Sequence, residues 1–344
     1  MKGLVSVIMG VHNEKPEYLR TAVDSICRQT YGDWEFIIID DAASDDCKAL
    51  LAEYEAQNSK IHVFHNADNL GLTKSLNIGL AKAGGEYIAR MDADDFSVPT
   101  RLEKQVRYLE SNPDIDLCGT GVVSFGDRSI FLSPYNGMTN DEAQCCLFFS
   151  STLCHPSVMI RKAFLDEHNL TYDESVKKGQ DYDMWERCSA CGKLAVMGEV
   201  LLFYRMHSGQ ITAVNKVDQD NSAIFVRKRR LARLGLVPDE KELECHRLLM
   251  EGKDAGITLG EIDAWIARII EANRRCGLVN DKALCSDLAY RRMLYMLRNG
   301  HYMQLAGADG IKRLWRLVNE RAAMRQKLNR ESCKLKKLLR NEQY

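Results

Sequence analysis

The feature that most constrains this chain is an alternation of short apolar runs with helix-forming segments, repeated four times before residue 113. The runs are unbroken, which is typical of strands that are covered on both faces. The expected strands are 4–10, 34–39, 61–65 and 86–91, and the expected helices begin at Pro16, after Ser44, at Leu72 and at Pro99. This alternation predicts an α/β fold with a doubly wound, mainly parallel sheet.

The pattern changes after residue 113. The sheet is expected to be completed by a hairpin over 115–125 and 129–132, a helix at 141–149, a strand at 155–160, a helix at 180–190, and strands at 194–196 and 200–205. After about residue 208 only helical patterns follow, at 218–234, 239–251, 259–276, 281–299 and 311–339. We therefore predict a catalytic region over 1–212 and a C-terminal helical region over 213–344.

The charge of the chain is unevenly distributed. The net charge is −1, yet residues 311–344 hold eleven Lys and Arg against three Asp and Glu. In 311–340 these basic residues surround an apolar helical stripe, which favours contact with an anionic membrane surface. The same stripe could instead pack on preceding helices or form a homodimer. Nucleic acid is not expected as a partner, because few aromatic residues accompany the charges.

The cysteines and the N-terminus point to a protein of the cytoplasm. The twelve cysteines have no disulfide-framework or zinc spacing, so we expect reduced thiols. Residues 4–11 resemble a signal peptide faintly, but the run is short and lacks a cleavage site, so it is interpreted as a buried strand. No stretch approaches ~18 apolar residues. We expect a cytoplasmic protein, peripheral on the inner face of the membrane if the tail binds there.

Polar residues follow the expected strands, where ligands bind in doubly wound sheets. Asp92 and Asp94 lie two residues apart after the fourth strand, so both can ligate Mn²⁺ or Mg²⁺ and leave positions for phosphate oxygens. The alternative is a solvated acidic loop or a helix cap. Asp40 and Asp41 follow the second strand and can accept hydrogen bonds from a nucleobase or ribose, or cap a helix.

Two further residues are candidates for chemistry. Asp181 opens an expected helix in the stretch Gly179–Trp185 and could take a proton from an attacking hydroxyl group. The alternative is a capping aspartate among structural aromatic residues. His207 ends the last expected strand and is either structural or a metal ligand.

Taken together, these stretches resemble family 2 of the GT-A glycosyltransferases, a group that builds bacterial surface polysaccharides. The resemblance covers about Val5 to Thr212. The matching stretches are Val5-Ser6-Val7-Ile8-Met9 with Asn13-Glu14, Ser25-Ile26-x-x-Gln29-Thr30-Tyr31, Glu35-x-Ile37-Ile38-Ile39-Asp40-Asp41, Asn69-x-Gly71-Leu72, Met91-Asp92-Ala93-Asp94-Asp95, His155-Pro156-Ser157, Gln180-Asp181-Tyr182-Asp183 and Tyr204-Arg205-x-His207.

The resemblance implies a Rossmann-like GT-A domain and an inverting, metal-dependent transfer from a nucleotide-diphosphate sugar. The expected donor is a UDP-linked hexose or N-acetylhexosamine, and the expected acceptor is a glycan or a lipid-linked glycan. Asp181 would be the catalytic base, and the metal would be held by Asp92, Asp94 and His207. The substrate-binding residues would be Asn13, Glu14, Asp40, Asp41, Asp92, His155 and Gln180.

Two departures from the family pattern concern the site. The first motif reads Gly10-Val11-His12-Asn13 where Pro-x-Tyr-Asn is usual, which affects the base pocket, and Gln180 replaces a usual Glu. The chain also lacks the motifs of two other enzyme classes. After the first strand it has neither the basic Gly-rich loop of sugar-1-phosphate nucleotidyltransferases nor the G-x-G-x-x-G of Rossmann oxidoreductases. The remaining alternative is a catalytically silent GT-A scaffold that binds nucleotide sugars.

Overall fold

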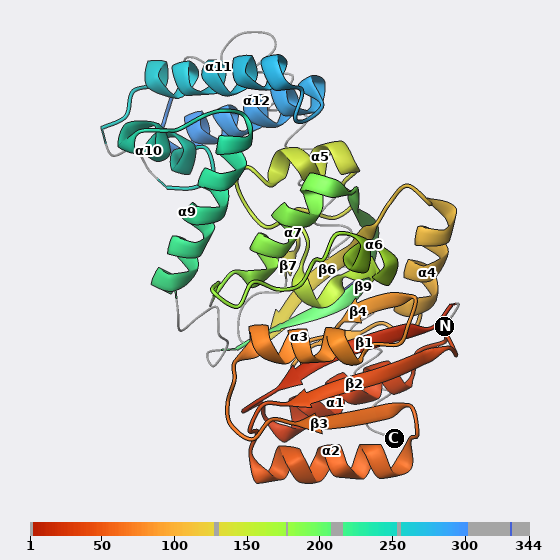
Figure 1. Cartoon of the computed structure of the whole chain (residues 1–344). Helices are drawn as coiled ribbons and strands as arrows, with labels where there is room; N and C mark the ends of the chain where they lie inside the picture. The colour runs from red at the N-terminus through yellow and green to blue at the C-terminus, as the bar shows by residue number, and fades with distance from the viewer. Residues whose placement is uncertain are drawn as a thin grey trace.

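A single mixed sheet organises the chain. The computed structural model describes residues 3–126, 131–176, 178–207, 216–252, 256–301 and 331. Within them the strand order is β3-β2-β1-β4-β8-β6-β9-β5, and β7 pairs with β6 (Figure 1). The strands are β1 (Val5–Val11), β2 (Trp34–Asp40), β3 (Ile61–His65), β4 (Tyr87–Arg90), β5 (Phe96–Ser97), β6 (Leu117–Gly126), β7 (Phe131–Leu132), β8 (Met159–Arg161) and β9 (Leu194–Met206).

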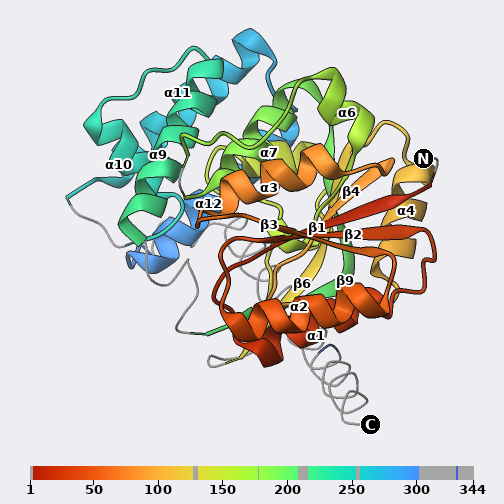
Figure 2. The same cartoon turned by 60° about the horizontal axis from the view of Figure 1, so that its bottom comes forward.

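The helices flank this sheet and then form a separate layer at one end. They are α1 (Pro16–Cys27), α2 (Asp45–Gln57), α3 (Leu72–Lys82), α4 (Arg101–Ser111), α5 (Asn140–Cys146), α6 (Lys162–Glu167), α7 (Gln180–Cys191), α9 (Lys216–Arg233), α10 (Glu240–Leu248), α11 (Leu259–Cys276) and α12 (Asp281–Arg298). A 3-10 turn, η1, spans His155–Ser157. Helices α1 and α2 lie on one face of the sheet and α3 and α7 on the other (Figure 2).

The four strands predicted first, β3, β2, β1 and β4, pair in parallel, which confirms the doubly wound half of the fold. The other half is mixed, because β8 is antiparallel to both β4 and β6 while β6 and β9 run parallel. In the parallel half the carboxyl ends of β1, β2 and β4 meet at one edge. Any ligand site of this half is therefore built from the loops that follow these strands.

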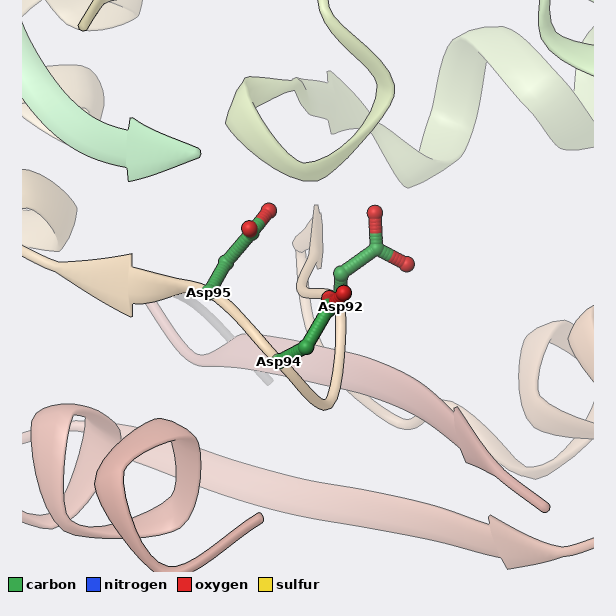
Figure 3. A group of neighbouring side chains, drawn as sticks. All are labelled: Asp92, Asp94 and Asp95. Carbon is green, nitrogen blue, oxygen red and sulfur yellow. The ribbon is translucent and has the colours of Figure 1, made fainter. Parts of the chain in front are cut away.

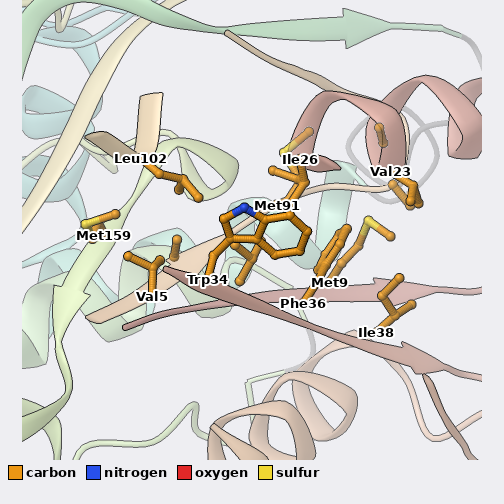
Figure 4. Packing of buried hydrophobic residues seen from close by; sticks show 14 of the residues in the cluster. Val5, Met9, Val23, Ile26, Trp34, Phe36, Ile38, Met91, Leu102 and Met159 are labelled. Atoms are coloured by element: carbon orange, nitrogen blue, oxygen red, sulfur yellow. The ribbon is translucent and has the colours of Figure 1, made fainter. Parts of the chain in front are cut away.

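The unbroken apolar strands contribute side chains to two hydrophobic cores, one on each face of the sheet, because successive side chains of a strand point to opposite faces. On one face Val5, Val7 and Met9 of β1 and Trp34 of β2 pack against α1, α2 and α4 (Figure 4). On the other face Ile8, Ile37 and Ile39 join buried residues of α3, α6 and α7, including the fully buried Trp185. This double burial is the reason the strands show no polar alternation.

Local signals place the helix starts near the sheet edge. Pro16 occupies the first turn of α1, where its missing N–H costs nothing, and the Ser44 hydroxyl accepts from the Cys47 amide to cap α2. One prediction was wrong: His155 begins a 3-10 turn rather than a strand, and β8 starts only at Met159. Pro156 explains the difference, since it cannot donate to a strand ladder. The short elements α6 and β5 were not predicted.

Helices α9–α12 confirm the predicted helical segments between 218 and 299. Their apolar faces share a core with Cys145, Phe148 and Phe149, which lie at and just after the end of α5. The division at residue 212 stays a proposal, because residues 208–215 lie outside the described residues. The predicted amphipathic helix over 311–340 also lies outside them, apart from Glu331. No described helix is long and apolar enough to cross a membrane. The described cysteines are all free thiols.

Candidate active site

A cleft of about 500 Å³ opens at the carboxyl ends of β1 and β4. Its floor is the turn between β4 and β5, and its far wall combines β6, the segment after β7, η1 and the start of α7. Predicted site residues that line it are Asn13, Glu14, Asp92, Asp94, His155, Gln180, Asp181 and His207. The fold therefore gathers residues from five separate motifs, up to 194 positions apart, around one space.

The floor of the cleft carries three carboxylates on one tight turn. Asp92, Asp94 and Asp95 follow β4 directly, and their side chains rise from the same turn (Figure 3). One oxygen from each lies within 4.8 Å of the others. The side chains of Asp92 and Asp94 are 28% and 17% exposed, whereas Asp95 is fully buried. The two predicted ligands thus face the cleft, and the third stands behind them.

The electrostatics of this turn favour a cation. Burial and the Asp92 charge raise the pKa of Asp94, and burial with both neighbouring carboxylates raises the pKa of Asp95 well above its usual range. One oxygen of Asp95, Oδ2, is buried with no hydrogen-bond partner. Arg90 forms an ion pair with Asp92 and offsets one negative charge. A divalent cation among hard carboxylate oxygens fits this donor set and would relieve the remaining repulsion.

His207 lies beside the same turn and also lines the cleft. Its Nε2 is 2.9 Å from Asp94 Oδ2, and its ring lies 5.5 Å from that of Tyr18 on α1. Next to it, Arg205 binds the turn from behind: its amide donates to Asp95 Oδ1 at 2.8 Å and its Nε to the Asp94 carbonyl at 2.7 Å. The end of β9 is thereby fixed on the acidic turn, 111 positions away in sequence.

The loop after β1 supplies another part of the cleft lining, Asn13 and Glu14. Burial, with help from Asp94 and Asp92, raises the pKa of Glu14, whose Oε2 accepts from the His12 amide at 2.8 Å. The His12 ring bridges loops, with Nδ1 2.7 Å from the Asp41 carbonyl and Nε2 2.9 Å from the side-chain amides of Asn13 and Asn69. These partners select the tautomer with the proton on Nδ1. The unusual histidine therefore ties the β1, β2 and β3 loops together.

Asp40 and Asp41 are not among the residues that line this cleft, and their expected contact with the donor stays a prediction. Asp40 is fully buried, with Oδ1 accepting from the Ala43 amide and Oδ2 2.7 Å from His65 Nδ1. Asp41 accepts from the Leu70 and Gly71 amides at 2.8 Å, and it is 4% exposed. These contacts hold the loops after β2 and β3 in place. Backbone N–H groups here occupy carboxylate oxygens that a ligand would otherwise use.

Loss of the Asp41 carboxylate should destabilise the protein measurably. In Asp41→Ala the Leu70 amide loses its acceptor, while the Gly71 amide keeps only Asn69 Oδ1 and the Asn66 side-chain amide only Ser75 Oγ. We expect the free energy of unfolding to fall by about 1–2 kcal/mol, because three part-buried hydrogen bonds are lost. Urea denaturation measures the change. Asp68→Ala, at an exposed position of the same loop, is the control and should change it by less than about 0.5 kcal/mol. Equal effects of the two changes would contradict this account.

Asp181 lines the same cleft as the acidic turn and lies in the first turn of α7. Gly179, with φ of 71°, provides the left-handed residue from which the helix starts. One carboxylate oxygen, Oδ2, accepts from the Ser151 hydroxyl at 3.3 Å, and burial raises the pKa of Asp181. The neighbouring Gln180 also lines the cleft. A desolvated carboxylate that faces a cleft is suited to accept a proton.

His155 contributes to the wall rather than to polar recognition. Its Nε2 lies 2.7 Å from the Tyr172 hydroxyl, its ring packs edge-on against Trp185, and only 8% of it is exposed. Burial and the Arg90 charge lower the pKa of His155 well below its usual range, so the ring is neutral. Its expected contact with substrate therefore stays a prediction, limited to the exposed edge.

Several cleft residues were not predicted from the sequence, namely Arg90, Ser151, Cys154, Lys178 and Tyr204. Arg90 carried a signal of its own: it is a lone cation at the end of the apolar run that becomes β4, two residues before Asp92. A buried cation needs a counter-charge, so its position pointed to the acidic turn. Tyr204 lies in the stretch Tyr204-Arg205-x-His207 and Cys154 directly before His155, so both are next to residues that were predicted. Ser151 and Lys178 lie in segments whose patterns do not reveal the cleft.

The family of this chain follows from its similarity to known proteins. The model for "Glycosyl transferase family 2" matches residues 6–169. A glycosyltransferase of Methanocaldococcus jannaschii is 37% identical over 209 residues, covering 60% of this chain and 71% of that protein. The O-antigen biosynthesis glycosyltransferase WbnJ of Escherichia coli is 32% identical over 211 residues, covering 60% and 80% respectively. This chain belongs to glycosyltransferase family 2.

Solved structures support the fold of this family 2 glycosyltransferase. S. aureus TarS 1-349 in complex with UDP-GlcNAc aligns with a TM-score of 0.58 at 16% identity, covering 87% of this chain and 91% of that one. At this identity the likeness bears on the fold alone, and it confirms the predicted GT-A architecture. Because the alignment extends over most of this chain, it includes part of the C-terminal helical region as well as the sheet.

Proposed function

We propose that this glycosyltransferase transfers a hexose or N-acetylhexosamine from a UDP-sugar to a glycan or lipid-linked glycan, with inversion at the anomeric carbon. The observation that carries the proposal is that one cleft is lined both by an acidic turn, Asp92 to Asp94, and by a separate desolvated carboxylate, Asp181. Such a pair separates the two tasks of a single displacement, which are stabilising the leaving diphosphate and activating the attacking hydroxyl group.

The proposed roles follow from these positions. Asp92 and Asp94, with His207 beside them, would hold Mn²⁺ or Mg²⁺. The bound cation would supply charge neutralisation for the departing UDP. Asp181 takes the proton of the acceptor hydroxyl group, and its raised pKa makes it a stronger base than an exposed aspartate. Ser151 orients the carboxylate, and the aromatic wall around His155 limits the access of water.

Relatives suggest the biological setting. WbnJ is named for O-antigen biosynthesis and AmsE of Erwinia amylovora for amylovoran biosynthesis. We infer that this enzyme likewise extends a surface polysaccharide. TarS has been solved with UDP-GlcNAc, which favours an N-acetylhexosamine donor. We place the enzyme in the cytoplasm, and the basic segment 311–340 would bring it to the inner membrane face or form a homodimer.

A panel of nucleotide sugars tests the proposal. Each is incubated with the protein and Mn²⁺, and UDP or another nucleotide released is measured. One UDP-sugar should release UDP at least about 10-fold faster than the others, because a missing substrate hydroxyl or amide leaves site groups unpaired. NMR of the product should show the opposite anomer to that of the donor. Metal-dependent UDP binding without release from any donor would favour the silent scaffold, and a retained anomer would exclude the single displacement.

A further inference from the structure

Helix α9 of the helical region runs alongside α7, whose first turn bears Asp181 (Figure 1). Ser222 Cβ lies 3.6 Å from the position that a Cβ on Gly179 would take, and Val226 joins the core that contains Trp185. Arg229 and Arg233 continue the same line toward the end of α9. The spacing of four, three and four residues puts these side chains on one helical face. This face of α9 therefore covers α7 from its N-cap onward.

Arg229 ties this face to the first turn of α7. Its Nη1 lies 2.7 Å from Asp183 Oδ1 and its Nε 2.6 Å from Glu186 Oε2. Both carboxylates belong to fully buried side chains. The second oxygen of Asp183, Oδ2, pairs with Nε of Arg187 in α7 itself, at 2.8 Å. Because buried carboxylates bind such partners strongly, Asp183 is fixed in position. Asp183 follows Asp181 by only two residues within the same helical turn.

A second contact of α9 is with the segment that carries Ser151, the hydrogen-bond partner of Asp181. Arg227 of α9 donates through Nε to the Phe149 carbonyl at 2.7 Å. Phe149 is two residues before Ser151, whose hydroxyl donates to the Asp181 carboxylate at 3.3 Å. Helix α9 thus contacts both the helix that carries Asp181 and the segment that binds its side chain.

We propose that Arg229, assisted by Arg227, is a positioning residue for Asp181, so that the helical region completes the acceptor side of the active site. The inference rests on the proposed function, in which Asp181 is the base. The donor side is built separately, on the loops after β1 and β4. Disturbing α9 should therefore slow turnover and leave nucleotide binding intact.

The test is Arg229→Met, assayed as Mn²⁺-dependent UDP release from the UDP-sugar that is hydrolysed fastest in the panel, with water as acceptor. We expect kcat to fall about 10-fold or more, because a base displaced by about 1 Å can cost up to about 10²-fold. KM for the donor and the calorimetric Kd for UDP should stay within about 2-fold of wild type. The acidic limb of the kcat–pH profile should move to lower pH, since water that reaches Asp181 removes the desolvation that raises its pKa.

Arg233→Met is the matched control. Arg233 also pairs with buried Glu186, at 2.8 Å, and its side chain is 26% exposed against 27% for Arg229, but it contacts the second turn of α7. Both variants should lower Tm, and only Arg229→Met should lower kcat substantially. A loss of kcat that simply follows the loss of Tm in both variants overturns the proposal, as does an unchanged kcat in Arg229→Met.

Two further variants keep the result interpretable. Arg229→Lys keeps the charge but offers one donor group in place of a fork. If Arg229→Met does not fold, lower kcat at wild-type UDP affinity in Arg229→Lys supports the proposal and wild-type kcat overturns it. Asp181→Asn, measured in parallel, distinguishes failure of the proposed function from failure of this inference. Full turnover in Asp181→Asn would show that Asp181 is not the base. Reduced turnover in Asp181→Asn with unchanged turnover in Arg229→Met would refute only the positioning role of Arg229.

Discussion

Asp181→Asn should lower kcat by about 10² or more while leaving the affinity for UDP nearly unchanged. The amide keeps the volume of the carboxylate and can still accept from Ser151, so the wall of the cleft is preserved. What is lost is the ability to take a proton from the acceptor. Because Asp181 comes from α7 and its side chain binds Ser151 rather than Asp92 or Asp94, the substitution should leave the acidic turn unaltered.

Steady-state UDP release and calorimetric UDP titration measure the two quantities. Glu174→Gln changes an exposed carboxylate on the segment ahead of α7 and should keep wild-type kcat. In wild type, kcat should fall toward acid, since a base must be ionised to act, and the midpoint should lie above the usual aspartate range because burial raises the pKa of Asp181. Wild-type turnover in Asp181→Asn would remove this residue from the role of base.

Asp94→Asn should weaken metal-dependent UDP binding by about 10²-fold or more. Loss of an outer-shell partner of a metal site already costs roughly 10- to 100-fold, and Asp94 faces the cleft directly as a proposed ligand. The amide removes a negative charge from the acidic turn and so weakens its attraction for Mn²⁺ or Mg²⁺. The removal also relieves the repulsion that raises the pKa of Asp95, so the folded state should not be less stable.

Calorimetric titration of UDP with and without Mn²⁺ isolates the metal-dependent part of the affinity. Asp33→Asn, at an exposed position just before β2 and therefore at the opposite edge of the sheet, should behave as wild type. A parallel measurement of Tm checks folding. If Asp94→Asn binds UDP with undiminished metal dependence, the cation is held elsewhere and the acidic turn has another role.

The sequence was informative about the sheet because the same residues that form the strands also make its cores. Unbroken runs such as Trp34–Asp40 bury side chains on both faces, and this requires helices on both faces. Parallel strands place their carboxyl ends at one edge of the sheet, and the order β2-β1-β4 brings the loops after β1 and β4 side by side. The linear pattern placed Asn13, Asp40, Asp41, Asp92 and Asp94 at that edge, and the family resemblance added Glu14.

The sequence did not reveal which polar groups face the ligand and which face the backbone. Asp41 and Asp94 both follow buried strands, yet Asp41 binds the amides of Leu70 and Gly71 while Asp94 faces the cleft. A carboxylate accepts equally well from a nucleotide and from a peptide N–H group. Only the path of the loop after β3 decides between them, and that path is fixed by contacts distant in sequence.

The sequence by itself determined the catalytic fold, the acidic turn and the helical nature of the C-terminal region, because strand and helix periodicities are local properties of the chain. The tertiary structure alone decided where α9 lies. An amphipathic helix specifies that one face will be buried, but not which partner will cover it. Arg229 and Asp183 lie 46 positions apart and are joined only after the sheet, α7 and α9 have packed, so the contact that links the helical region to Asp181 has no signature in the linear sequence.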